Sequence, residues 1–230
     1  MEITEPTDGT KLTVSNGDTS YTNALATTKP NMTPVSAWFS THYGPKVSYS
    51  KNWVLSSGSL WFDRWTDILT FSPQYLEIIT WNYYGESHYI GPLNSPHIDD
   101  GNSKWTNDVS HDGLLSMAKP YIEAFKAGSK TVDSSIESDQ SIYWYRPTLI
   151  SASCDSTDTC EKALATANLN HSIGKPNRYD TMQDTVFVVA LLTSAGTVSV
   201  ISGCNSQSFD AKADLNIFQV NMGIGNNRSL

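Results

Sequence analysis

The chain has 230 residues, of which 39% are hydrophobic and 17% are charged, and its formal net charge is -8 with a pI near 5.0. Acidic and basic residues are interspersed, which argues against a nucleic-acid or anionic-membrane partner and favours a neutral ligand. The mean hydropathy of -0.34 and the lack of a long apolar run exclude a transmembrane protein and predict a globular chain of one large domain or two small ones.

The beginning of the chain predicts little regular structure before its first strand. Residues 1–29 are rich in Thr, Ser, Asn and Gly, so they predict loop with one short helix over about 21–27. The segment 32–39 predicts a strand. Residues 40–45, which end in a Gly-Pro step, predict the loop that follows this strand.

Two amphipathic helices are predicted from apolar residues at helical spacing. The first begins after Ser57 or Ser59, either of which can cap it, and ends before Pro73. The second covers about 112–127, and Pro120 is expected to kink or divide it. The apolar stripes, which we interpret as core, comprise Leu60, Trp61, Trp65, Ile68 and Leu69 in the first helix and Leu114, Ala118, Tyr121, Ile122 and Phe125 in the second.

The strands around these helices follow the pattern of a parallel barrel. Residues 75–81 are apolar on both faces, as in a strand covered by helices on one side and by barrel core on the other. Residues 142–147 predict another strand. The order strand, helix, strand, helix, strand over 32–147 is therefore that of a piece of a parallel α/β barrel.

The C-terminal part of the chain predicts antiparallel β structure. Two β-rich runs, 185–192 and 197–202, are joined by a short turn, and 216–222 offers a third. We place a boundary between about 150 and 180.

The cysteines and tripeptides of the glycosylation type indicate a secretory origin. Cys154 and Cys160 lie in a polar loop at a spacing that permits a small disulfide loop, and Cys204 is left over. No histidine lies near that pair, so we expect neither a metal nor a cofactor. The chain begins without the basic start and apolar stretch of a secretory signal, so no signal peptide is expected in it. The tripeptides, which also arise by chance, begin at Asn31, Asn170 and Asn227.

One predicted strand end is a candidate active site. The strand over 75–81 runs into a polar, aromatic loop that carries one carboxylate, Glu86. Parallel barrels build their active sites at such strand ends, so Glu86 stands where a catalytic acid is useful.

These segments resemble the fungal α-1,3-glucanases, or mutanases, of glycoside hydrolase family 71. The resemblance spans about residues 20–225, and the long block that includes Glu86 is its most specific part. The blocks that carry it are MTPVSAWF (32–39), KNW (51–53), LWFDRW (60–65), ITWNYYGESHYIGPL (79–93), HDG (111–113), MAKPYI (117–122) and YWYRP (143–147).

The resemblance implies a (β/α)₈ barrel followed by a β-sandwich, and endo-hydrolysis of cell-wall α-1,3-glucan with inversion. We therefore expect residues 1–150 to form the C-terminal portion of a barrel, 151–180 a cysteine-containing linker loop and 181–230 a partial β-sandwich. Because the chain resembles only the later part of the family's catalytic region, we expect an incomplete barrel with an exposed edge that can associate. A secreted or cell-wall location is implied as well.

The resemblance also implies the catalytic pair and one departure from it. The family motif carries an Asp and a Glu; Glu86 matches the Glu, as general acid, while Tyr83 stands at the Asp. Inverting hydrolysis needs two carboxyl groups roughly 6.5–9.5 Å apart. A phenol with an ordinary pKa of about 10 is a poor base at neutral pH, so we expect this chain to be impaired or inactive. Asp99, Asp100 and Asp112 could each replace the missing base. The alternatives are that Asp99 and Asp100 are solvated loop residues and that Asp112 caps a helix.

The residues expected to bind glucan are Trp38, His42, Trp81, Asn82, His88 and Tyr89. Flat aromatic rings stack on sugars but also fill cores, and Arg146 fits a structural ion pair as well as a sugar contact. Two functions remain open: an α-1,3-glucanase fragment, or a non-catalytic α-glucan-binding remnant or degenerate gene product.

Overall fold

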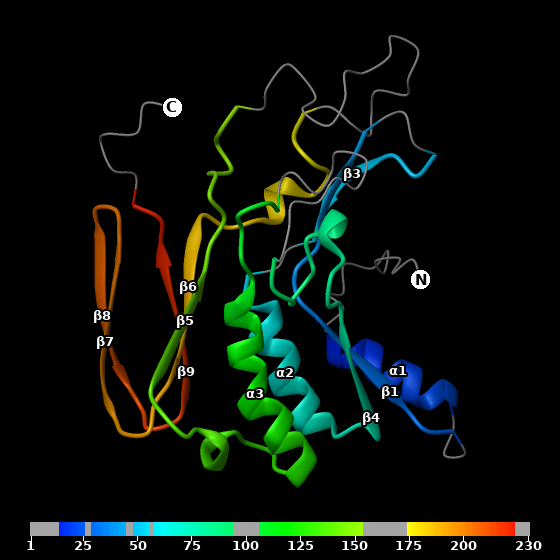
Figure 1. The fold of residues 1–230 in the computed structure, drawn as a ribbon, viewed down its shortest axis with the longest axis vertical. Helices are drawn as coiled ribbons and strands as arrows, with labels where there is room; N and C mark the ends of the chain where they lie inside the picture. The colour runs from blue at the N-terminus through cyan, green and yellow to red at the C-terminus, as the bar shows by residue number, and fades with distance from the viewer. Residues whose placement is uncertain are drawn as a thin grey trace.

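The computed structural model describes residues 14–25, 29–44, 48–55, 58–93, 106–153 and 174–223 (Figure 1). Its helices are α1 (Val14–Leu25), α2 (Leu60–Phe71) and α3 (Asp112–Ala127), with short 3-10 turns η1 (Tyr84–Glu86), η3 (Asp133–Ser135) and η5 (Tyr179–Thr181). Its strands are β1 (Met32–Ser36), β2 (Ser40–Tyr43), β3 (Lys51–Val54), β4 (Tyr75–Ile79), β5 (Gln140–Trp144), β6 (Thr185–Leu191), β7 (Gly196–Ser202), β8 (Asn205–Ala211) and β9 (Leu215–Asn221).

A parallel pair of strands, β1 and β4, positions the candidate site. The two strands pair over their whole length, with Ser36 opposite Ile79 at their carboxyl ends. Parallel strands need a long connection, and here it contains the β2–β3 hairpin and helix α2. Both strands end earlier than the predicted ranges 32–39 and 75–81, so the residues that follow them form loops at one edge of the sheet.

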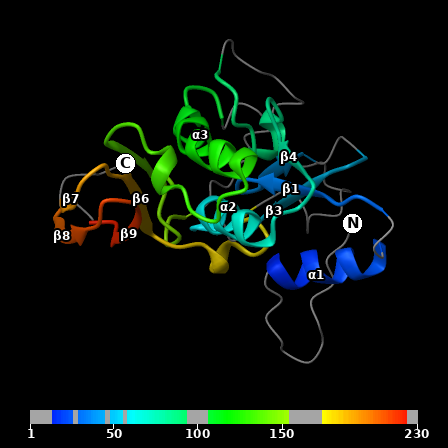
Figure 2. The same cartoon turned by 90° about the horizontal axis from the view of Figure 1, so that it is seen from below.

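The core lies where α2 and α3 pack against each other. Trp61 and Trp65 of α2 are buried, as predicted, and the Trp65 ring stacks on Tyr121 of α3 at 5.4 Å between centroids. Figures 1 and 2 show both helices between the β1–β4 pair and the C-terminal strands. The helices therefore bury one face against each set of strands, which explains their apolar stripes.

Helix α3 runs unbroken through Pro120, so of the predicted kink or division the division is wrong. A proline inside a helix costs roughly 3 kcal/mol because a hydrogen bond is lost. Here Pro120 is buried in a helix whose packing face includes Met117, Tyr121 and Ala124. This burial offsets the lost bond. The helix ends at Gly128, whose φ of +68° suits a residue without Cβ.

The predicted loop over 40–45 is wrong, because residues 40–43 form β2. This strand pairs in antiparallel register with β3, and both strands alternate half-buried with buried residues. The pairing partner begins only at Lys51, so local sequence gave no signal of the ladder.

The C-terminal strands form two small antiparallel sheets. The order of the first is β5–β6–β9, and the second is the β7–β8 hairpin. One expectation was wrong, because β5 pairs with β6 in antiparallel register rather than extending the parallel pair. Strand β8 was missed. Phe209 of β8 stacks on Phe218 of β9 at 4.6 Å, so the hairpin packs on one face of the three-stranded sheet.

Helix α1, longer than the predicted 21–27, is fixed by a buried arginine. The Arg64 side chain is only 5% exposed; its Nη2 donates to Asp18 Oδ1 of α1 at 3.0 Å and its Nε to the Pro34 carbonyl of β1 at 2.8 Å. One guanidinium thus joins α1, α2 and β1, and both groups of the buried ion pair are compensated.

Within the described residues, no barrel is closed, and the outer edges of β1 and β4 have no strand partner. The barrel portion over 1–150, the linker over 151–180, the sandwich over 181–230 and association through a barrel edge stay predictions. Part of the linker, including Cys154 and Cys160, lies outside the described residues; Cys204 is exposed between β7 and β8.

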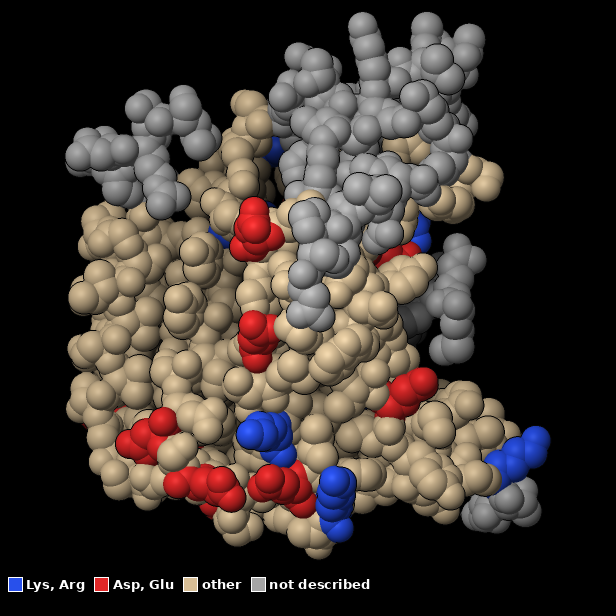
Figure 3. Space-filling model, in the orientation of Figure 1, with Lys and Arg blue, Asp and Glu red and all other residues tan. Residues whose placement is uncertain are grey.

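No described helix is both long enough and apolar enough to span a bilayer. On the face drawn in Figure 3, acidic and basic side chains are mixed rather than separated by sign.

Candidate active site

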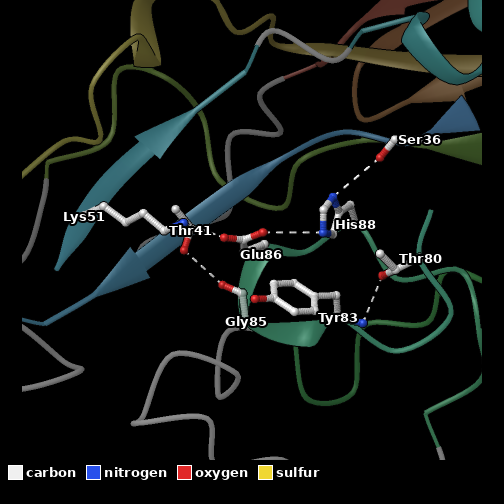
Figure 4. Close-up of polar contacts among 8 residues, drawn as sticks. All are labelled: Ser36, Thr41, Lys51, Thr80, Tyr83, Gly85, Glu86 and His88. Carbon is white, nitrogen blue, oxygen red and sulfur yellow. Dashed lines mark hydrogen bonds and ion pairs between the residues drawn. The ribbon is translucent and has the colours of Figure 1, made fainter. Parts of the chain in front are cut away.

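Glu86 lies on the turn η1, which follows β4 at the carboxyl edge of the parallel pair (Figure 4). The loop folds back on itself, since Thr80 N donates to His88 O at 3.2 Å and Ile90 N to Thr80 O at 2.9 Å. A third bond comes from β2, where Thr41 Oγ1 donates to the buried Gly85 carbonyl at 3.0 Å. These bonds fix the backbone that carries the carboxylate.

Both oxygens of Glu86 face nitrogen atoms of other side chains. Lys51 Nζ, from β3, lies 2.5 Å from Oε1, and His88 Nε2 lies 3.5 Å from Oε2 without hydrogen-bond geometry. The side chains of Glu86, His88 and Lys51 are 15%, 13% and 33% exposed. The carboxylate is therefore half-buried, and Figure 4 shows it between the ammonium and the imidazole.

His88 is held in a pocket of polar and aromatic groups. Its Nδ1 lies 3.4 Å from Ser36 Oγ, and its ring meets Phe39 edge-on at 5.6 Å. Burial lowers the pKa of His88 below its ordinary value, Glu86 opposes this shift, and Lys51 adds to it. Burial therefore favours the neutral imidazole near pH 7.

Tyr83, at the position of the motif Asp, is 50% exposed beside the same cluster. Its backbone N donates to Thr80 Oγ1 at 3.1 Å, and its ring lies 5.4 Å from that of His88. A phenol, not a carboxylate, therefore stands on the solvent side of Glu86 and His88.

Tyr89 lies beneath the loop and, together with His111, lines a cavity, so its predicted role in glucan binding stays a prediction. The residue is fully buried, and its ring stacks on that of His111 at 3.8 Å and 9°. Its hydroxyl donates to the Val109 carbonyl, and the Tyr89 carbonyl lies 2.8 Å from His111 Nδ1. Burial raises the pKa of Tyr89 and lowers that of His111 to about 4. Both rings support the loop from inside.

The other predicted glucan-binding residues divide into two groups. Trp38 and His42 are half-buried and line a cavity of about 490 Å³. Trp81 and Asn82 are exposed on the loop before η1, and Trp81 packs against Gly91, where an added Cβ would lie 2.8 Å from the indole. Their roles in binding stay predictions.

The cavity adjoins Glu86 but does not include it. Ser87, next in the chain, lines the cavity together with Tyr145 and Arg146 from the segment after β5. Arg146 was expected to form either a structural ion pair or a sugar contact. Its Nη2 lies 2.7 Å from Asp184 Oδ1, so it forms the ion pair. The cavity walls combine aromatic, aliphatic and polar side chains, and their apolar part suits a neutral ligand.

No second carboxylate is placed beside Glu86 by any contact of the described residues. Asp99 and Asp100 lie outside the described residues. Asp112 is exposed in the first turn of α3, where His111 holds the N-cap position, so the predicted capping role is wrong. The described residues contain no group of side chains that suits a metal ion.

The tripeptide beginning at Asn31 does not present a glycan acceptor. Asn31 is only 7% exposed, and its Nδ2 donates to Thr22 Oγ1 at 3.1 Å. Asn170 and Asn227 lie outside the described residues.

Comparison with known proteins decides the family. The model of glycosyl hydrolase family 71 matches residues 5–229. The chain belongs to this family. It is 40% identical to a mutanase of Penicillium rubens over 198 residues, which are 86% of this chain and 40% of that protein.

Two relatives come from Schizosaccharomyces pombe. A glucan endo-1,3-alpha-glucosidase is 35% identical, over 90% of this chain and 44% of the relative. An ascus wall endo-1,3-alpha-glucanase is 30% identical, over 77% of this chain and 38% of the relative. The chain spans about two fifths of the length of these relatives. No solved structure matches it.

Sequence reasoning missed Lys51 and Thr41, the two residues of the β2–β3 hairpin that hold η1. Lys51 belongs to the KNW block of the family resemblance, which was the available signal. It could not be assigned to Glu86, because the two residues are 35 positions apart and the hairpin was not predicted.

Proposed function

We propose that this chain forms part of the active-site region of an α-1,3-glucan hydrolase, with Glu86 as the proton-donating carboxyl. Membership of family 71 and the two relatives named for a 1,3-alpha-glucan linkage support the substrate. The observation that carries the assignment is the half-buried position of Glu86, fixed by Thr41 at the carboxyl edge of β1 and β4. Carboxyl groups at such edges are placed to meet a substrate.

The proposed reaction is endo-acting hydrolysis with inversion. A protonated carboxyl donates to the leaving glycosidic oxygen, while a carboxylate on the other face of the sugar removes a proton from the attacking water. His88, neutral because it is buried, and Trp38 and His42 on the cavity wall would hold the sugar ring. Trp81 would stack on the chain outside.

We also propose that this chain is inactive or nearly so. Tyr83 occupies the place of the motif Asp, and loss of one acid or base group typically costs a factor of about 10²–10⁴ in rate. A barrel that includes β1, α2 and β4, followed by a β-sandwich, is the proposed fold of the complete catalytic region. The parallel pairing of β1 and β4 across α2 supports this fold.

A graft into an active relative tests the assignment of both residues. Residues 14–223 would replace the matching segment of the Penicillium rubens mutanase, and reducing-sugar release from α-1,3-glucan would be measured. We expect almost no release from the graft, recovery with Tyr83→Asp, and its loss when Glu86→Gln is added. Circular dichroism and thermal melting establish that each graft is folded.

Two results contradict the proposal. Hydrolysis by the unmodified chain that Glu86→Gln abolishes would show that Tyr83 does not impair the site. Activity of the Tyr83→Asp graft that survives Glu86→Gln would remove Glu86 from the reaction.

A second candidate function is binding of α-glucan without turnover. Tyr83 favours it, and so does Trp81, which keeps 57% of its surface exposed in a loop that is otherwise intact. Retention on glucan separates this function from a degenerate product, which would not be retained. For either function we propose an extracellular or cell-wall location, supported by the relative named for the ascus wall.

A further inference from the structure

We propose that Lys51 is the positioning residue of this site: it holds one oxygen of Glu86, leaves the other facing His88, and places a positive charge behind the carboxylate. The inference rests on the proposed function, because it concerns the same carboxyl.

The β2–β3 hairpin delivers Lys51 to the site. Lys51 is the first residue of β3 and lies opposite Tyr43, at the far end of β2. The hairpin contacts η1 twice, through the bond from Thr41 to Gly85 and through the pair of Lys51 with Glu86. Backbone and carboxylate of η1 are thus held by one element.

Two aromatic rings restrict the Lys51 side chain. Its Nζ lies 5.5 Å from the centroid of the Phe39 ring and 5.8 Å from that of Tyr43. Both distances are within the range in which a ring face attracts a cation. The ammonium is therefore held at Oε1 of Glu86 before any ligand arrives, which lowers the entropy lost on orienting the carboxylate.

The ammonium also acts on His88, beyond Glu86. The charged and titratable groups that face His88 are Glu86 at 3.5 Å, Lys51 behind it, and the phenol of Tyr83. Glu86 favours a proton on the imidazole, whereas burial and Lys51 oppose it. Lys51 thus adds to the effect of burial in favouring the neutral imidazole, while its ammonium pairs with Oε1 of Glu86.

The experiment is an NMR titration of the histidine side chains in the full chain. Lys51→Met should raise the pKa of His88, because the repulsion from the ammonium is removed. Glu86→Gln should lower it, and Lys51→Arg should leave it near the wild-type value. The matched control is Lys130→Met. Lys130 donates to the Thr70 carbonyl of α2 at 3.0 Å, and α2 leads into the end of β4 that lies away from Glu86.

His111 separates a charge effect from loosening of the loop. Its pKa of about 4 depends on burial under Tyr89, the neighbour of His88 in the chain. If Lys51→Met merely loosened the loop, the pKa of both histidines would rise toward the ordinary value. We expect His88 alone to move.

An unchanged His88 in Lys51→Met, or a parallel rise of His111, would overturn the proposal. So would a His88 shift in Lys51→Arg as large as that in Lys51→Met. The titration does not need turnover, so a chain that releases no sugar still decides the role of Lys51. A failure of the proposed function and a failure of this inference are therefore seen separately.

Discussion

His88 and Tyr89 are neighbours in the chain, yet they belong to two different environments. His88 faces Glu86 and Lys51 on the polar side of the loop, whereas Tyr89 points to the opposite side and stacks on His111. Both histidines have a pKa lowered mainly by burial, but only His88 has two charged groups that act on it in opposite directions. The comparison shows that alternation along a short extended segment divides the loop into a chemical side and a supporting side.

The supporting side should carry most of the stability of the loop. The Tyr89 hydroxyl donates to the Val109 carbonyl, and His111 Nδ1 lies 2.8 Å from the Tyr89 carbonyl, so these polar groups are paired within the protein. The chemical side keeps Tyr83 and Trp81 in contact with solvent. Substitutions on the two sides should therefore differ in kind, with loss of folding on one and loss of glucan contact on the other.

The largest effect is expected for Tyr89→Ala. Removing a buried aromatic side chain typically costs about 3–5 kcal/mol, because apolar burial is lost and a cavity remains. Tyr89→Phe keeps the stack on His111 but leaves the Val109 carbonyl without its donor, at about 1–3 kcal/mol. The free energy of unfolding in urea measures both. The control on the chemical side is Tyr83→Ala, whose free energy of unfolding should lie within about 0.5 kcal/mol of that of wild type. A loss of stability as large as that of Tyr89→Ala would contradict the division of the loop into a chemical and a supporting side.

The next effect is a pH dependence that arises from His111. Its pKa is about 4 in the folded chain, against about 6.5 for an ordinary histidine, so between these values the unfolded chain binds the extra proton. Stability is therefore full above pH 6.5 and falls as the pH drops to about 4, by up to about 3 kcal/mol. His88, whose pKa is also lowered, contributes with the same sign.

Urea unfolding at a series of pH values measures this dependence. His111→Phe retains a ring against Tyr89 and removes the titrating group, so its stability should vary less with pH over this window than that of wild type. An equal slope for the two proteins would assign the effect to carboxylates instead.

The supporting side also shows where sequence reasoning reached its limit. Helices α2 and α3 were predicted closely, because their stripes and their stops at Pro73 and Gly128 are local signals. The burial of Tyr89 was not foreseen, because it depends on His111, which lies 22 positions later. A pattern of residues does not show which side of a loop will be covered by another element.

The chemical side follows the same rule. Glu86 was found because it directly follows a recognisable strand, but Lys51 and Thr41 required the pairing of β2 with β3. Strand β5 was also recognised as a strand and given the wrong neighbours, since its partner β6 begins about forty positions later, at Thr185. Pairing between distant segments is set by burial across the whole molecule rather than by local propensity.

Trp81→Ala should have the smallest effect on stability but a large effect on glucan binding. The indole is 57% exposed, so its removal should change the free energy of unfolding by no more than about 0.5 kcal/mol. Retention on insoluble α-1,3-glucan should nevertheless be lost, because an exposed flat ring in the loop that leads to Glu86 is a surface on which a sugar chain can stack. Tyr75→Ala removes another exposed ring, 54% accessible, at the opposite end of β4, and should be retained like wild type. Glu86→Gln should be retained as well, since the amide keeps the shape of the carboxyl.

If wild type is not retained, the binding function is refuted. If Trp81→Ala is retained as well as Tyr75→Ala, the chemical side of the loop does not bind the glucan.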